Sequence, residues 1–148
     1  MHYHLLDALL ASCQHMIAFA LTMGLFGQWL LLYLPAARCN ITLLARLDVV
    51  YGLLAAAIML AGSARLLWGA KGWHYYGDNA TFWLKLGCFS LIGLLSVKPT
   101  VRIRQWHRNT QPPSAEKIAS LRRWKSVELG LLIPILLLAP MIARSIGR

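Results

Sequence analysis

The residue with the most distinctive chemistry in this chain is His15, which lies inside a long apolar run near the N-terminus. No lysine, arginine, aspartate or glutamate occurs between Ala8 and Ala37, so the imidazole is a polar exception in a segment suited to lipid. Ionisable groups at the centre of a membrane helix cost at least about 2.5 kcal/mol and persist where something pairs with them. An imidazole there can ligate haem iron or another metal, shuttle a proton, or hydrogen-bond to a neighbouring helix.

A second group of candidate residues lies in the stretch "RLLWGAKGWHYYGDNATFWLKL", residues 65–86. Arg65 and Lys85 are two cations with few acidic neighbours, an arrangement that suits an anionic group such as a propionate, carboxylate or phosphate. Between them the segment is rich in aromatic side chains, Trp83 among them, and it can cap a site beneath it. The alternative is that these aromatic side chains only anchor the chain at the membrane surface, where tryptophan and tyrosine gather.

A membrane-embedded scaffold is needed to position these residues. The chain of 148 residues is 58% hydrophobic and only 14% charged, which is more apolar than a water-soluble domain of this length requires. Four apolar stretches can each cross a hydrocarbon core of roughly 30 Å, which takes about 20 helical residues. We place the spans at about residues 5–34, 43–68, 82–101 and 121–143. The predicted fold is therefore all-α: an integral membrane four-helix bundle that forms a single transmembrane domain over residues 1–148.

The first span carries a narrow face of small residues that includes His15. Ala8, Ala11, His15, Ala18 and Thr22 recur at steps of three and four residues, so they share one side of a helix. Small residues on one side let a neighbouring membrane helix approach closely. We therefore expect this face to pack against another helix, with His15 pointing into the bundle.

Two carboxylates and several cations cluster in sequence at one end of the predicted bundle. Asp48 lies near the start of the second span, and Glu128 lies one turn beyond Lys125 on the fourth. Both carboxylates enter the membrane from the same side, so they can meet Arg46, Lys98 or Lys125 in a charge network. We expect this network to pair charges for structural reasons.

The last helix has a clear start signal in water before it reaches the membrane. Pro112 and Pro113 stop the preceding segment, Ser114 is a suitable N-cap, and Glu116 supplies the negative charge favoured in a first turn. The helix should therefore begin near Ser114.

The three cysteines do not form a metal or redox motif. Cys13 and Cys88 lie within predicted spans, Cys39 lies in the first connection, and no CxxC occurs. We expect structural or lipid-facing thiols. The chain also lacks a phosphate-binding loop, a dinucleotide fingerprint and any carboxylate pair at hydrolase-like spacing.

The net charge of +10 follows membrane topology. Ten of the fifteen basic residues fall on one side of four spans, within the connection at 34–46 and the long loop expected at 98–125. By the positive-inside rule both connections are cytoplasmic, and both termini are non-cytoplasmic. The partner implied by this distribution is the lipid bilayer with its anionic headgroups, and we expect no nucleic acid.

Three stretches of the sequence resemble a known family. They are "LARLDVVYGLLAAAIMLAGSARLLWGAKGWHYYGDNATFWLKL", "LLSVKPTVRI" and "LLIPILLLAPMIARSIGR". Over nearly the whole chain they are similar to a family of predicted bacterial four-helix membrane proteins that carries only a domain-of-unknown-function label. The resemblance implies a multi-pass protein of the bacterial inner (cytoplasmic) membrane, and it implies no particular activity.

More distantly, the chain is similar to copper-resistance-D-like membrane proteins and to HemJ-type protoporphyrinogen oxidases, compact helical bundles of which the oxidases bind haem b. In the oxidases a first-helix histidine is functional, and His15 occupies that position. A "W-x-x-K-L" motif that opens their third helix is functional too, and Phe82, Trp83, Lys85 and Leu86 resemble it. The resemblance implies haem b as the cofactor, and no other cofactor is expected. His15 would be the metal ligand, and Arg65, Lys85 and Trp83 would bind the cofactor with it.

This chain departs from the oxidases in one respect. They have a further histidine about two turns after that lysine, whereas "LKLGCFSLIGLL" contains none. The second axial ligand would then be Met16, Met23 or Met59, or it would come from a partner chain.

Two classes of function follow from these observations. The first is a haem- or tetrapyrrole-binding redox protein of the inner membrane that uses an intramembrane histidine. The second is a non-catalytic accessory or assembly subunit, in a homo-oligomer or a larger membrane complex, that docks through its small-residue faces and aromatic loop. Transport of a metal or small anion is a third class. The sequence leaves open whether the protein is an enzyme.

The topology gives a prediction that can be checked by thiol labelling. A single cysteine placed at Gln111 should react with a membrane-impermeant reagent only after the membrane is opened, because this connection carries the excess of basic residues. Cysteines placed near either terminus should react in intact cells. Labelling at Gln111 from outside would contradict the predicted orientation.

Overall fold

The computed structural model describes residues 2–35, 39–68, 78, 80–109 and 112–143. The chain forms helices α1 (His2–Leu31), α2 (Ile41–Trp68), α4 (Ala80–Arg108) and α5 (Ala115–Ala143). No strand occurs among the described residues. The prediction of an all-α four-helix bundle is confirmed.

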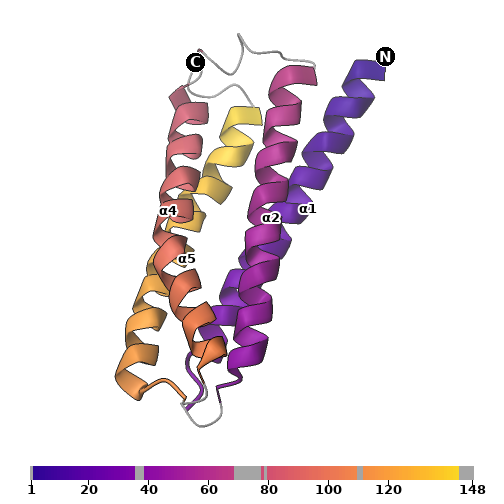
Figure 1. The fold of residues 1–148 in the computed structure, drawn as a ribbon. Helices are drawn as coiled ribbons and strands as arrows, with labels where there is room; N and C mark the ends of the chain where they lie inside the picture. Colours follow the sequence, from indigo (N-terminus) through magenta and orange to yellow (C-terminus); the bar gives the residue numbers. More distant parts are fainter. Residues whose placement is uncertain (1, 36–38, 69–77, 79, 110–111, 144–148) are drawn as a thin grey trace.

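The helices pack in a ring in which each one contacts its neighbours along the chain, and α5 closes the ring against α1. Figure 1 shows an up-and-down arrangement, with both chain termini at one end of the bundle. We call that end the terminal end. At the opposite end α1 and α4 finish and α2 and α5 begin, and we call it the basic end because most of the basic residues of the sequence lie in or next to these helix ends.

The side chains that face outward identify a membrane protein. Helices α1, α2 and α4 contain the candidate spans Ala8–Leu31, Ile41–Ala64 and Phe82–Arg108, and in the apolar 18-residue stretch of each span only 11%, 17% and 22% of the residues are buried in the protein. Met16, Leu60 and Leu94 are each 72% exposed. Such surfaces suit lipid rather than water. The fourth predicted span, 121–143, lies on α5 and stays a prediction.

The core consists of two hydrophobic clusters stacked along the bundle axis. The cluster nearer the basic end contains Leu32, Cys39, Leu44, Ile103, Trp106, Ile118 and Leu121. The second cluster lies toward the terminal end and contains Leu21, Leu25, Tyr51, Ile92, Leu132 and Ile135. Closer to the termini, residues 8–20, 52–64 and 82–91 include no buried side chain among those that the structure describes. In Figure 1, α1 stands well apart from α4 at that end.

Helix α4 is longer than the sequence predicted. We expected the third span to end near residue 101 and a loop to follow, but the helix continues through Pro99 to Arg108. A proline inside a helix costs about 3 kcal/mol or more. Burial offsets that cost, since Pro99, Ile103 and Trp106 continue one buried face at steps of four and three residues. The prediction of a long loop is therefore wrong, and the connection is short.

The starts of α2 and α5 are set by local hydrogen bonds. The Asn40 side chain accepts a hydrogen bond from the backbone N–H of Leu43 (2.9 Å), which satisfies one of the free donors at the start of α2. Helix α5 begins at Ala115, and the Ile118 N–H donates to the Ser114 carbonyl (3.1 Å). The predicted start near Ser114 is confirmed.

Cys39 gives a test of packing at the basic end. The side chain is buried, and burial raises the pKa of the Cys39 thiol. Because a raised pKa lowers the thiolate fraction at neutral pH, a water-soluble maleimide should label Cys39 more slowly than an exposed thiol. The labelling rate of an ordinary thiol levels off above about pH 8.5. The labelling rate of Cys39 should keep rising about tenfold per pH unit beyond that point.

The measurement uses a chain with Cys13 and Cys88 replaced by serine. The control replaces Cys39 by alanine and places a cysteine at the exposed Asn109. Equal rates and equal pH profiles for the two thiols would show that Cys39 is not buried in the folded protein.

Candidate functional site in the bundle core

Polar side chains from all four helices lie between the two hydrophobic clusters. Five of them are buried, and Lys125, Glu128 and Gln28 have no exposed surface. We call this set the buried polar layer: Gln28 on α1, Asp48 on α2, Ser96 and Thr100 on α4, and Lys125 and Glu128 on α5.

Lys125 is the centre of this layer. Its ammonium Nζ donates to Glu128 Oε2 at 3.2 Å and lies 3.7 Å from Asp48 Oδ1. Thr100 Oγ1 donates to the same Asp48 oxygen at 3.2 Å. Nζ also lies 5.2 Å from the centre of the Tyr51 ring, where a cation is attracted to the aromatic face. These contacts tie α2, α4 and α5 together.

The predicted charge network is confirmed for one cation and not for the other two. Asp48 and Glu128 both approach Lys125. Arg46 and Lys98 are exposed, and the Lys98 ammonium lies 5.2 Å from the centre of the Trp124 ring. They lie on outward sides of α2 and α4, so they cannot reach the carboxylates in the core.

The spacing along α5 explains why two charged residues are buried. The buried positions on this helix are 118, 121, 125, 128, 132 and 135, which alternate in steps of three and four. This is the regular seam of a helix facing a bundle. Lys125 and Glu128 occupy two seam positions that elsewhere hold leucine or isoleucine. Extending these steps of three and four from Ile118 along the sequence would have predicted that Lys125 and Glu128 face the core.

The layer is not electrically balanced when every group is ionised. One ammonium faces two carboxylates, which leaves a net charge of −1 in a region without exposed surface. An uncompensated charge in a low-dielectric core is strongly unfavourable. The layer therefore favours the binding of one further positive charge.

Three polar atoms in the layer have no hydrogen-bond partner among the described residues. They are Glu128 Oε1 and both amide atoms of Gln28, Oε1 and Nε2. A buried polar atom left unpaired costs about 1–3 kcal/mol. A proton can satisfy Glu128 Oε1, whereas the Gln28 amide needs an acceptor for Nε2 and a donor for Oε1; internal water, which commonly occupies such polar positions, can serve all three atoms.

Gln28 lies at the same height as the charged residues. The preceding residue, Gly27, faces Leu47 on α2, where a Cβ added to the glycine would lie 3.7 Å from Leu47 Cδ1. The following residue, Trp29, donates from Nε1 to Ser126 Oγ on α5 at 2.8 Å. Since neighbouring residues differ in height by about 1.5 Å, these two contacts place Gln28 near the height of Asp48 and Lys125.

His15 does not point into the bundle. It is exposed, and its Nδ1 lies 2.7 Å from the carbonyl oxygen of Ala11, one turn earlier. The inward face of α1 instead follows Leu21, Leu25 and Gln28. The prediction that His15 points inward is wrong. The small-residue face of α1 lies beside the face that enters the core, and its member Ala11 is only half-buried.

The other predicted site residues lie near the terminal end. Arg65 is in the last turn of α2 and Lys85 is in the second turn of α4, but their side chains fall outside the part that the structure describes, as does segment 69–77. Trp83 is 49% exposed and packs edge-on against Phe82, with ring centres 5.6 Å apart. Convergence of Arg65 and Lys85 on one ligand stays a prediction.

The described residues contain no group of three or more histidine, cysteine, aspartate or glutamate side chains that could hold a metal ion. Met16 and Met23, considered as axial ligands, are 72% and 71% exposed on α1. Any metal bound by His15 would therefore lie on the outer surface of this helix.

The central place of Lys125 gives a stability prediction. Lys125→Met should lower the free energy of unfolding by about 3–5 kcal/mol, because it leaves two carboxylates uncompensated in the core. The triple variant Lys125→Met, Asp48→Asn, Glu128→Gln should recover most of that loss, since no buried charge remains. Reversible unfolding in detergent micelles measures both. If the triple variant is no more stable than Lys125→Met, the loss of stability in Lys125→Met does not come from uncompensated carboxylates.

One family of proteins matches the chain, whereas no curated protein and no solved structure does. The profile of that family, described as "Predicted membrane protein (DUF2214)", matches residues 6–147. The match covers nearly the whole bundle, including every residue of the buried polar layer. The chain belongs to the DUF2214 family of predicted membrane proteins.

Proposed function

We propose that this membrane protein binds and releases a proton at the buried polar layer. The observation that carries the proposal is the imbalance of one ammonium against two carboxylates, combined with an unpaired carboxylate oxygen, Glu128 Oε1. Ionisable groups inside membrane proteins often belong to proton or ion pathways. One added proton makes the layer neutral.

Glu128 is the group that takes the proton. Its Oε2 accepts from Lys125, so Oε1 is the oxygen left to be protonated. A protonated Oε1 becomes a donor, which an internal water molecule can accept. Asp48 Oδ1 already accepts a hydrogen bond from Thr100 and lies beside the Lys125 ammonium. The three ionisable groups act as one unit, because each contacts or faces the others.

The hydrophobic clusters on either side control access to this unit. Leu32 and Leu121 close the layer toward the basic end, and Leu25 and Leu132 close it toward the terminal end. A proton therefore exchanges only when the packing on one side opens. Proton exchange of this kind serves coupled transport of a small solute or a redox reaction in the membrane.

A purely structural charge cluster is the competing explanation. Such a cluster would be expected to satisfy its polar atoms, since most buried polar groups in proteins are paired. Three unpaired atoms in one layer favour exchange with water or protons. Observing the protonation state of the carboxyl groups separates the two explanations.

Infrared spectroscopy of the protein in lipid tests proton binding directly. The carbonyl-stretch band of a protonated carboxyl should appear and disappear reversibly with pH in the wild type, and Glu128→Gln should remove it. Glu116→Gln is the matched control, because Glu116 is an exposed carboxylate on the same helix. A band that survives Glu128→Gln, or no titrating band at all, would contradict the proposal.

A haem- or tetrapyrrole-binding role is a second candidate, carried by His15. If Nδ1 donates to the Ala11 carbonyl at 2.7 Å, the ring is held in the tautomer that leaves Nε2 unprotonated, which is the form that ligates a metal. A haem inside the bundle does not fit the exposed imidazole. A tetrapyrrole on the outer surface of α1 fits it. A haem would supply redox chemistry there.

Absorbance of the purified protein tests this second candidate. A Soret band that is lost in His15→Ala would support it. Colourless protein that co-purifies with other membrane subunits would instead favour the role of an accessory subunit. The apolar outer face of α1, with Met16, Phe19 and Met23, supports docking of that kind.

A further inference from the structure

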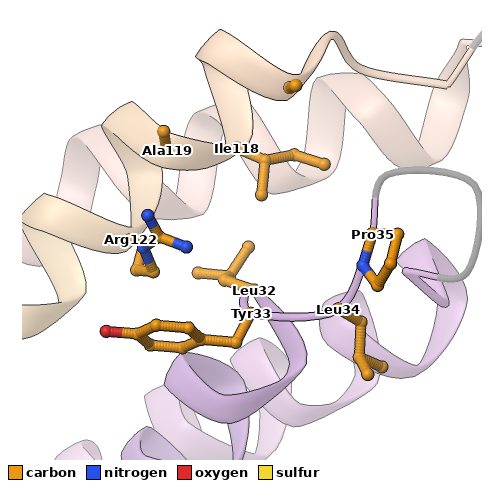
Figure 2. A pocket seen from close by; sticks show the side chains of 8 residues that line it. Leu32, Tyr33, Leu34, Pro35, Ile118, Ala119 and Arg122 are labelled. Atoms are coloured by element: carbon orange, nitrogen blue, oxygen red, sulfur yellow. The ribbon is translucent and has the colours of Figure 1, made fainter.

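A small pocket opens at the basic end, between the turn that follows α1 and the first two turns of α5. Its volume is about 260 Å³. The walls include the apolar side chains Leu32, Leu34, Pro35 and Ile118, together with Tyr33 and Arg122. Figure 2 shows the Arg122 guanidinium above the Tyr33 ring, with Ile118 and Pro35 on the other sides.

The pocket lies where lipid headgroups meet the protein. The candidate span of α1 ends at Leu31, and the pocket begins at the next residue, Leu32. On α5 it is lined from Ala115, the first helical residue, to Arg122. Its volume falls just below the roughly 300–1,000 Å³ of typical ligand pockets, so it suits a headgroup and not a whole lipid.

Arg122 is the polar group of the pocket. It is half-buried, and its guanidinium carbon lies 4.4 Å from the centre of the Tyr33 ring. No described residue supplies a carboxylate or any other acceptor for its side-chain N–H groups. A guanidinium held flat on an aromatic ring still presents its edge, where two N–H groups can bind one phosphate.

The surface around the pocket is strongly positive. Among the described residues, the exposed cations at this end include Arg104 and Arg108 in the last turns of α4 and Lys117 and Arg123 on α5. Among the described residues of this end, the exposed carboxylate is Glu116, which does not line the pocket. Such a field attracts anionic lipids over zwitterionic ones.

The geometry points to a binding site for the phosphate headgroup of an anionic phospholipid in this pocket. Arg122 holds the phosphate, and Tyr33 fixes the guanidinium from behind. Leu32, Leu34 and Ile118 contact the apolar part of the lipid next to the headgroup. The site is separate from the buried polar layer, and it stands whether or not Glu128 exchanges a proton.

Native mass spectrometry of the full-length protein, released from detergent micelles, tests the site. The probes are phosphatidylglycerol and phosphatidylcholine of identical acyl chains. The wild type should retain phosphatidylglycerol at least about tenfold more tightly, because the choline ammonium of phosphatidylcholine offsets the charge of its phosphate and is repelled by Arg122 and the other cations at this end. Arg122→Gln should abolish most of this preference. Arg122→Lys keeps the charge without the two-pronged geometry and should give an intermediate value.

The matched control is Arg123→Gln, which removes the same charge from the exposed neighbouring position and should leave the preference unchanged. Equal losses in Arg122→Gln and Arg123→Gln would overturn the site in favour of general surface charge. Equal retention of both lipids by the wild type would also overturn it. If millimolar inorganic phosphate displaced phosphatidylglycerol completely, the occupant of the pocket would be a free anion and the lipid site would be overturned.

Discussion

The burial of Lys125 between two carboxylates is the constraint on which the other features depend. A lysine without exposed surface requires partners from more than one helix, and here they come from α2 and from its own helix, α5. Thr100 on α4 joins them by donating a hydrogen bond to Asp48. Because electrostatic attraction is strong in a dry core, these contacts fix the relative height and rotation of three helices more strictly than apolar packing alone.

The two hydrophobic clusters have a clear role in relation to this layer. They lie above and below it and keep bulk water away from the charges. The outside suits lipid, because the large apolar side chains of α1, α2 and α4 are exposed there. In lipid there is little hydrophobic gain from packing helix on helix, so polar contacts and close packing contribute more of the specificity. The half of the bundle near the termini has no comparable polar layer among its described residues.

The two ends of the bundle therefore have different chemistry. The basic end combines exposed cations, short connections and a headgroup-sized pocket, whereas the described residues near the terminal end include the exposed Asp78 and Trp83. The exposed cations lie at one end and the ionisable layer lies deeper in the bundle, so the two routes to that layer differ in charge. Any proton that reaches Glu128 from the basic end must pass a positively charged surface and then the cluster around Leu32.

The sequence alone determined the class of fold, the number of helices, the start of α5 and the meeting of Asp48 and Glu128 with a cation, whereas the structure decided that this cation is Lys125. The hydropathy of a segment and its capping residues are local signals. They can be interpreted without knowing which helices pack beside the segment. The extension of α4 to Arg108 was missed because Pro99 is locally unfavourable and only burial compensates it. The rotation of α1 was also missed. A helix that is apolar on every side gives no local mark of its inward face. Only packing against the other three helices decided that Gln28 lies inside and His15 outside.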